Sequence, residues 1–232
     1  MSERILIIDY GVGNHQSVAN ALETLGYAFE LSGDIEMIRR AKAYILPGVG
    51  AIGEAMKNLE KLKIIDSLTK EVMHNKKPIL GICLGMQMMA ESSEEGGHHR
   101  SLGWIQGRVV KLDPGIGYSV PQVGWNTVHI HEREPLFTKI EEGSNFYFDH
   151  SYHFVCDDQC VSASCSYGGK VTAAVRKDNI FGVQFHPEKS QNNGLKVFRS
   201  FFNYVNSRDD IRKPYPRVHP EEQSDEGSFN LR

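Results

Sequence analysis

The sequence predicts an α/β fold whose first half alternates strands with helices and whose second half is rich in strands. In the first half, apolar runs at 4–9, 43–46 and 79–82 are separated by segments with the spacing of an amphipathic helix. From Trp104 onward, β-like segments follow one another between turn signals, and one last amphipathic helix closes this part. A length of 232 residues suits one such domain or two small ones.

Composition excludes several classes of function. A formal net charge of −3 gives no case for binding nucleic acid or an acidic membrane surface. No apolar run approaches the ~18 residues that a membrane span needs, and the first residues lack the long apolar region of a signal peptide. Four cysteines do not make a disulfide framework in this length, so we expect a cytoplasmic protein.

Two regions are expected along the chain. Residues 1–206 would form the domain, and its last helix carries an apolar face made of Phe198, Phe201, Phe202 and Val205. Residues 207–232 are charged, contain three prolines and have few large apolar side chains to bury. We therefore predict a flexible C-terminal tail without a catalytic role.

The first strand, 4–9, leads through the glycine-rich turn 10–14 into a helix. Its apolar face carries Val18, Ala21, Leu22 and Leu25. A dinucleotide site would have a similar beginning, but this turn lacks the third glycine of that fingerprint, so we interpret it as a tight connection. A second strand, 43–46, is followed by Pro47-Gly-Val-Gly50 and by a helical region that runs on toward Asn75.

The stretch 79–91 is the most informative in the chain. A buried strand, 79–82, is followed without a linker by a predicted helix, 84–91, and Gly81 and Gly85 bracket Cys83 between them. This is the pattern of a nucleophile elbow, whose apex adopts a strained backbone, here with a thiol in place of a hydroxyl. A helix N-terminus favours the thiolate, and the N–H of Leu84 would face an oxyanion. The alternative is a buried core cysteine.

The turn 47–50 is a candidate for the second half of that oxyanion hole. A Pro-Gly turn with a second glycine can leave backbone N–H groups of Val49 or Gly50 pointing outward. The alternative is an ordinary turn at the start of a helix.

The second half contains predicted strands at 105–112, 123–131, 145–148, 160–167, 170–176 and 180–185. The polar stretch 92–100 before them is expected to be an exposed loop, and neither its two histidines nor the remaining cysteines have metal-ligand spacing. The last of these strands delivers His186 at its end, with Glu188 two residues later. A cysteine nucleophile needs a base, and the base needs an orienting group, so these two residues are the candidates.

Five motifs, in this order, carry a resemblance to a known family. PGVG, GICLGMQ, PQVGWN, YFDHSYH and GVQFHPEKS resemble those of class I (triad) glutamine amidotransferases, over about 5–206. The resemblance implies a flavodoxin-like fold with a mixed central sheet and helices on both faces. It places the nucleophile at Cys83, the base at His186, the orienting acid at Glu188 and the oxyanion strand at 47–50. The implied glutamine-binding residues are Gln87, Glu95, His150, Ser151 and Tyr152.

The resemblance implies a glutaminase that needs no cofactor and no metal. It would hydrolyse glutamine to glutamate and ammonia, and the ammonia must reach an acceptor site before it is protonated. The chain has no phosphate-binding loop that could form such a site, so we expect a second subunit.

Three of the motifs, PxxGWN, HSY and HPEKS, are most similar to those of amidotransferase subunits of imidazole glycerol phosphate synthases. That similarity implies a heterodimer with a (β/α)8-barrel cyclase, which forms imidazole glycerol phosphate and AICAR in histidine biosynthesis. Trp125, Asn126 and Lys189 correspond to positions at the interface, although a core position for Trp125 stays open.

Two residues depart from the family pattern. Gln122 stands where the family usually has His, and Asp149 stands where an apolar residue usually precedes the HSY motif. These departures leave open a paralogous amidotransferase that supplies ammonia for an amidino sugar of surface polysaccharides. An alternative of another class is a stand-alone cysteine hydrolase of γ-glutamyl peptides.

Overall fold

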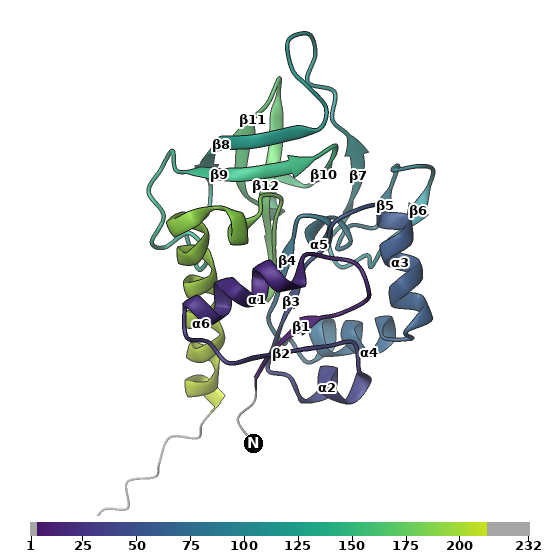
Figure 1. The fold of residues 1–232 in the computed structure, drawn as a ribbon, viewed down its shortest axis with the longest axis vertical. Helices are drawn as coiled ribbons and strands as arrows, with labels where there is room; N and C mark the ends of the chain where they lie inside the picture. The colour runs from purple at the N-terminus through teal and green to yellow at the C-terminus, as the bar shows by residue number, and fades with distance from the viewer. Residues whose placement is uncertain (1–3, 213–232) are drawn as a thin grey trace, which may run out of the picture.

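The computed structural model describes residues 4–212, which form a large mixed sheet, a smaller sheet and helices on both faces (Figure 1). The central sheet has nine strands in the order β2-β1-β3-β4-β13-β12-β11-β8-β9. Its strands are β1 (Ile5–Ile8), β2 (Phe29–Ser32), β3 (Ala43–Leu46), β4 (Ile79–Ile82), β8 (Gln122–Ile130), β9 (Asn145–His150), β11 (Val161–Ser166), β12 (Lys170–Lys177) and β13 (Ile180–Val183). Neighbours are parallel from β2 to β13 and antiparallel from β13 to β9.

A second sheet of four strands, ordered β10-β7-β5-β6, packs beside the first. It consists of β5 (Ser92–Ser93), β6 (His99–Arg100), β7 (Gly107–Lys111) and β10 (Tyr152–Cys156). Ser151 lies between β9 of the large sheet and β10 of the small one, so the chain passes from one sheet to the other at this residue.

Helices cover both faces of the parallel strands. The helical segments are α1 (His15–Thr24), α2 (Ile35–Arg40), α3 (Ile52–Lys61), α4 (Ile65–Thr69), η1 (Lys70–His74), α5 (Leu84–Gln87), η2 (Asp158–Cys160), η3 (Pro187–Lys189) and α6 (Gln191–Arg212). The helices α1 and α6 pack on one face, and α2, α3, α4 and η1 pack on the other (Figure 1).

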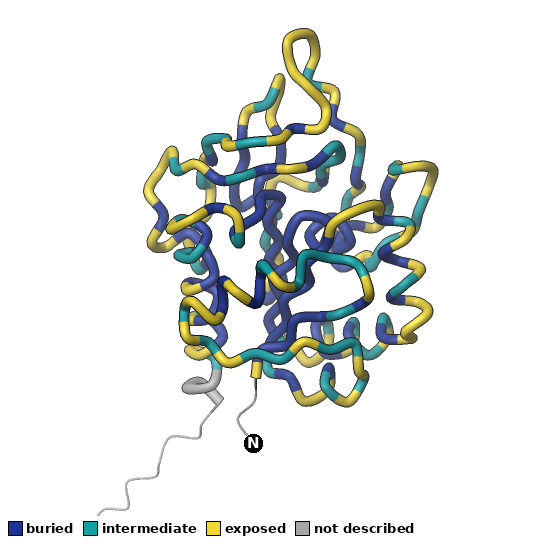
Figure 2. Tube along the Cα trace, in the orientation of Figure 1, coloured by how far each residue is buried: buried dark blue, intermediate teal, exposed yellow. Residues whose placement is uncertain are grey.

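The alternation of side chains along β1 explains why both faces need a cover. Ile5 and Ile7 belong to the apolar core under α1 and α6, whereas Leu6 and Ile8 belong to the core on the opposite face. All four side chains are buried, and each contributes about 2 kcal/mol on burial. In Figure 2, the buried segments are concentrated along the central strands.

The predicted fold class is confirmed, and β3 and β4 lie at the predicted residues. The prediction missed β2, α2 and β10. Strand β2 is only partly buried at the edge of the sheet and therefore shows no apolar run. The expected exposed loop at 92–100 contains β5 and β6, and Ser93 within it is buried.

The predicted helix 84–91 is wrong in its length, because α5 ends at Gln87. The carbonyl groups of the next three residues bind another segment instead of continuing the helix. Leu102 donates its backbone N–H to Met88, Gly103 donates to Ala90, and Trp104 and Ile105 both donate to Met89. This docking buries residues 88–90 on all sides, which explains why the stretch is apolar without being helical.

The last helix, α6, continues to Arg212, beyond the expected domain end at 206. Residues 213–232 of the predicted tail lie outside the described residues, so the division into 1–206 and 207–232 stays a prediction.

Candidate active site

Cys83 lies at the apex of a strained turn between β4 and α5. Its backbone has φ of +52° and ψ of −106°, a conformation that non-glycine residues rarely adopt. The flanking glycines make this turn possible. A Cβ at Gly85 would lie 1.8 Å from the carbonyl oxygen of Leu46, and one at Gly81 would lie 2.7 Å from the carbonyl group of Gly85. The elbow conformation expected from the sequence is therefore present.

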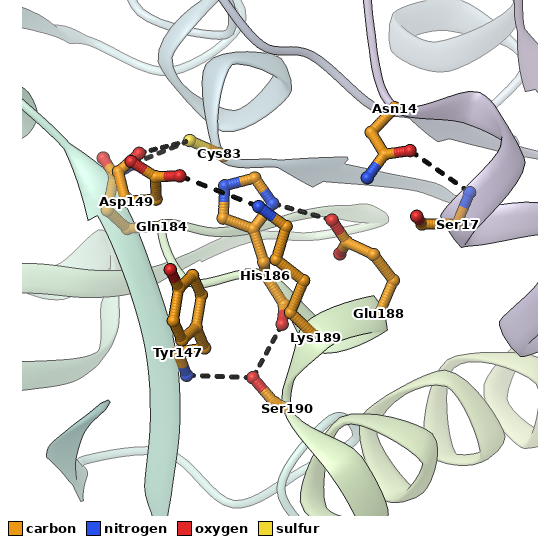
Figure 3. A network of polar contacts seen from close by, with 10 residues as sticks. All are labelled: Asn14, Ser17, Cys83, Tyr147, Asp149, Gln184, His186, Glu188, Lys189 and Ser190. Carbon is orange, nitrogen blue, oxygen red and sulfur yellow. Dashed lines mark hydrogen bonds and ion pairs between the residues drawn. The ribbon is translucent and has the colours of Figure 1, made fainter. Parts of the chain in front are cut away.

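The neighbouring strand β13 brings His186 to the same edge of the sheet. Ile82 and Val183 are paired in the parallel register, so the residues that follow both strands emerge side by side. The backbone N–H of His186 donates to the carbonyl of Tyr147 at 2.8 Å. Ser190 Oγ donates to the carbonyl of His186 at 2.6 Å, which fixes the main chain on its other side (Figure 3).

His186 and Glu188 form a buried ion pair. The distance between His186 Nδ1 and Glu188 Oε1 is 2.7 Å, and both side chains are almost fully shielded from solvent. Burial alone would lower the pKa of His186, but hydrogen bonds to Cys83 and Glu188, together with the charges of both groups, outweigh it and raise the pKa to about 10. The imidazole is therefore protonated at neutral pH and can act as a general acid toward a group held at the sulfur.

The sulfur of Cys83 also contacts two groups that are not part of this triad. Its Sγ lies 3.8 Å from the backbone carbonyl oxygen of Asp149, to which the thiol form can donate, and Nε2 of Gln184 donates to Sγ at 3.5 Å (Figure 3). Sequence reasoning missed Gln184. The available signal was a single amide in the otherwise apolar run 180–185.

The candidate oxyanion segment 47–50 lies against the elbow. Tyr10 donates its hydroxyl to the carbonyl of Pro47 at 2.7 Å. A Cβ at Gly48 would lie 2.8 Å from Cβ of Leu84, so only glycine permits this close approach. Val49 and Gly50 are both exposed, and the positive φ of Gly50, +91°, favours glycine there.

Four of the five predicted glutamine-binding residues come together beside Cys83. Gln87 Nε2 donates to the carbonyl of Tyr152 at 2.8 Å, and the same carbonyl lies 2.8 Å from Nδ1 of His150. His150 Nε2 lies 3.2 Å from Oε1 of Gln122, the residue that departs from the family pattern. Burial lowers the pKa of His150 to about 4, so its ring is neutral at pH 7. Ser151 lies between His150 and Tyr152, at the junction of the two sheets.

Glu95 contacts a different element. Its Oε2 accepts the backbone N–H of Ile52 at 2.8 Å, at the N-terminus of α3, where Ala51 provides no side-chain cap. This contact places Glu95 next to the candidate oxyanion segment rather than beside Gln87. Its predicted binding of the substrate ammonium group stays a prediction.

Trp125 and Lys189 lie on one exposed face of the molecule. The Trp125 side chain is 50% exposed, which excludes the core position. Its ring meets Tyr147 edge-to-face at 6.1 Å, and Lys189 Nζ lies 5.3 Å from the centre of the same Tyr147 ring. Lys189 Nζ also lies 3.6 Å from Oδ2 of Asp149.

Asn126 is not part of this face. It follows Trp125 in strand β8 and therefore points to the opposite side of the sheet. Its Nδ2 donates to the carbonyl of Ser166 at 3.0 Å, and its Oδ1 accepts the N–H of Thr127.

Within residues 4–212, no group of three or more His, Cys, Asp or Glu side chains is arranged to hold a metal ion. In the same part of the chain, no helix has both the length and the apolar character required to cross a membrane.

Comparisons with known proteins agree in pointing to one family. Residues 6–204 match the family model described as Glutamine amidotransferase class-I. The chain is 48% identical over 203 residues to the imidazole glycerol phosphate synthase subunit HisH 2 of Vibrio vulnificus, a match covering 87% of this chain and 95% of that protein. It is 45% identical over 202 residues to the subunit HisH 2 of Pseudomonas aeruginosa, covering 87% and 100%. The structure of PurLQS from Thermotoga maritima shares the fold, with a TM-score of 0.68, 22% identity and coverage of 88% and 100%.

Proposed function

Because this chain belongs to the class-I glutamine amidotransferase family, we propose that it is the glutaminase subunit of an imidazole glycerol phosphate synthase. It hydrolyses glutamine to glutamate and ammonia, and the ammonia passes to a cyclase subunit that forms imidazole glycerol phosphate and AICAR in histidine biosynthesis. The observation that carries the chemistry is a strained Cys83 at the end of β4, beside the strand that delivers His186, whose Nδ1 lies 2.7 Å from Glu188 Oε1.

The reaction proceeds through a thioester. The Cys83 sulfur attacks the carboxamide carbon of glutamine, and the carbonyl oxygen becomes an oxyanion. His186 gives its proton to the departing nitrogen, so the C–N bond breaks and ammonia leaves. The now neutral His186 takes a proton from water, and the resulting hydroxide attacks the thioester carbon. Cleavage of the C–S bond releases glutamate and restores the sulfur.

Backbone groups near the elbow supply the oxyanion hole in this proposal. The N–H of Leu84 lies at the first residue of α5, and Val49 or Gly50 contributes the second donor from the segment packed against Leu84. Donors of this kind typically accelerate acyl transfer by about 10²–10³-fold.

The substrate would lie between α5 and the junction of the two sheets. Both hydrogen bonds of the Gln87 amide are donated by Nε2, so its Oε1 is available to accept from glutamine. The ring nitrogens of His150 both contact protein oxygens, so we expect His150 and Ser151 to bind the substrate through their main chain.

The partner would dock on the face that carries Trp125. Val123 is 58% exposed and Trp125 is 50% exposed on the same strand, and Lys189 stands beside them against Tyr147. Half-exposed aromatic side chains are frequent anchors of interfaces. We propose that the partner is a (β/α)8-barrel cyclase.

The site of action would be a reducing cytoplasm, since the reaction requires a free Cys83 thiol and all four cysteines are free.

Glutamate release by the purified chain tests this proposal. It should be measured for the chain alone, with a (β/α)8-barrel cyclase subunit, and with that subunit plus the phosphoribosyl-formimino intermediate of histidine synthesis. We expect strong stimulation only when partner and intermediate are both present. Stimulation by the partner that is indifferent to the intermediate would instead support the amidino-sugar acceptor. Rapid hydrolysis of γ-glutamyl peptides without any partner would support the stand-alone hydrolase.

A further inference from the structure

The sulfur of Cys83 receives a hydrogen bond that the triad does not supply. Gln184 Nε2 lies 3.5 Å from Sγ, and Figure 3 shows the two side chains facing each other. The Gln184 side chain is completely buried. A buried amide is costly unless its polar groups are paired, so its partners define what it does in the folded protein.

A single backbone carbonyl fixes which end of this amide faces the sulfur. The carbonyl of Tyr152 can only accept, so the Gln87 atom 2.8 Å from it must be the amide nitrogen. That nitrogen also lies 3.0 Å from Gln184, and it must donate there to Oε1. The remaining terminal group of Gln184 is its NH₂, which points at Sγ.

The backbone holds Gln184 in this place from both sides. The N–H of Cys83 donates to the carbonyl of Val183 at 2.8 Å, and the N–H of Gln184 donates to the carbonyl of Ala173 at 2.8 Å. The parallel register of β4 and β13 therefore sets residues 83 and 184 side by side.

The two non-triad neighbours of the sulfur favour opposite protonation states. The carbonyl of Asp149 can only accept, so it interacts favourably with the S–H group. The amide of Gln184 donates, and a hydrogen bond to a charged acceptor is roughly twice as strong as one to a neutral acceptor. Gln184 therefore stabilises the thiolate relative to the thiol.

We propose that Gln184 is a further catalytic residue that holds the reactive thiolate through its amide N–H, and that Gln87 is a positioning residue that orients this amide. The proposal rests on the proposed function in one respect, namely that Cys83 is the nucleophile. The role of Gln184 is separable from glutamine binding, because its hydrogen bond to Cys83 joins two side chains of the free protein.

The test is the rate at which iodoacetamide alkylates Cys83, measured against pH by mass spectrometry of the peptide that contains it. In Gln184→Leu we expect the pH midpoint of alkylation to rise by roughly one unit, because the thiolate loses one hydrogen bond that stabilises its charge. In Gln184→Glu, which keeps the shape but adds a carboxylate, the rise should be larger. Gln87→Leu should shift the midpoint in the same direction by less.

The matched control is another buried amide, Asn179, whose Nδ2 donates to the carbonyls of Val72 and Lys77. Asn179→Leu should lower the melting temperature and leave the alkylation midpoint of Cys83 where it was. An unchanged midpoint in folded Gln184→Leu or Gln184→Glu overturns the proposal. If Gln184→Leu does not fold, Gln184→Glu and Gln87→Leu give the answer.

Turnover gives a second readout. With the cyclase subunit and the intermediate present, and at a pH below the wild-type alkylation midpoint, kcat for glutamine in Gln184→Leu should fall roughly tenfold, with KM within about twofold. A rise in KM at unchanged kcat would show that Gln184 only shapes the substrate pocket. If the wild-type thiol reacts as expected but glutamine is not hydrolysed even with the cyclase subunit and the intermediate present, the proposed function fails and this inference stands.

Discussion

The two walls of the active site are built differently. The inner wall, Cys83, Gln184 and His186, lies at the ends of the parallel strands β4 and β13, is almost fully buried and is fixed by backbone hydrogen bonds. The outer wall, Asp149 and Lys189, is partly exposed and joined by an ion pair of 3.6 Å. The residues proposed for catalysis therefore lie where the packed core fixes the positions of their side chains. Asp149, one of the two departures from the family pattern, has a partly exposed side chain that the core does not fix in this way.

The largest effect is expected for the proposed nucleophile, Cys83. Cys83→Ala should reduce glutamate release to background, by at least about 10³-fold, because no thioester can form. The matched control is Cys165→Ala, a buried cysteine on β11 whose loss should affect stability more than rate. Glutamate release is measured by a coupled assay, and substantial activity in the Cys83 variant contradicts the mechanism.

The next effect concerns the His186–Glu188 pair, whose imidazolium is proposed to protonate the departing ammonia. Glu188→Gln should lower kcat on the order of 10³–10⁴-fold, as loss of the orienting acid does in comparable triads. It should also move the alkaline limit of activity. The raised pKa of His186, about 10, keeps the imidazolium present below that pH, and removal of Glu188 lowers the limit. The pH profile of kcat measures both, and an unchanged alkaline limit would argue against this role of Glu188.

A third effect tests how tightly the inner wall is packed. Gly85→Ala should destabilise the fold by more than about 3 kcal/mol or prevent folding, because the new Cβ would lie 1.8 Å from the carbonyl oxygen of Leu46. Gly169→Ala is the control, since nothing lies within 4 Å of a Cβ there. Urea unfolding compares the two, and equal stabilities would show that the elbow is less constrained than described.

Whether a residue of the inner wall could be predicted from the sequence depends on how far along the chain its contacts lie. The elbow at Cys83 was recognisable because its glycines, its apolar strand and its apex all lie within a few residues of each other. Gln184 was not, since its partners Cys83 and Gln87 are about a hundred positions away and only the strand register brings them together. The end of α5 was missed for a similar reason, because the hydrogen bonds to the carbonyls that follow it come from residues 102–105, a later segment of the chain.

The partner interface expected from the resemblance stays a prediction, and the structure gives only the positions of its residues. The resemblance placed Trp125, Asn126 and Lys189 on a partner-facing side, and the structure puts Trp125 and Lys189 together around Tyr147 but turns Asn126 away. Neither the pairing of Lys189 with Asp149 nor the helix-capping contact of Glu95 follows from the local sequence pattern.

His150 gives a smaller, pH-dependent effect. Its folded-state pKa of about 4 lies below the ordinary value of 6.5, so acidification favours the unfolded chain, which takes up the proton first. Between pH 7 and pH 5 this costs about 2 kcal/mol of stability. Urea unfolding at pH 7 and pH 5 measures this loss in the free energy of unfolding, which should be smaller by that amount in His150→Gln than in the wild-type protein. Equal losses in both proteins would contradict the role of His150.

The smallest effect is expected at the outer wall. Asp149→Ala removes a partly exposed ion pair with Lys189 and should change the free energy of unfolding by less than about 1 kcal/mol, less still at high salt. Urea unfolding at two salt concentrations measures it. A loss above about 2 kcal/mol would show that this wall is as firmly held as the inner one.

Whether Cys83 is the residue that attacks glutamine can be tested with a chloroketone analogue of glutamine. The electrophilic carbon of this analogue occupies the place of the carboxamide carbon. Burial raises the pKa of Cys156 and of Cys165 to about 12 and also raises that of Cys160, so these three thiols form internal controls. We expect the chloroketone to modify Cys83 alone, at the same rate as glutaminase activity is lost. We also expect added glutamine to slow the modification of Cys83. Modification of the other cysteines while Cys83 stays free, or labelling that glutamine does not slow, would contradict it.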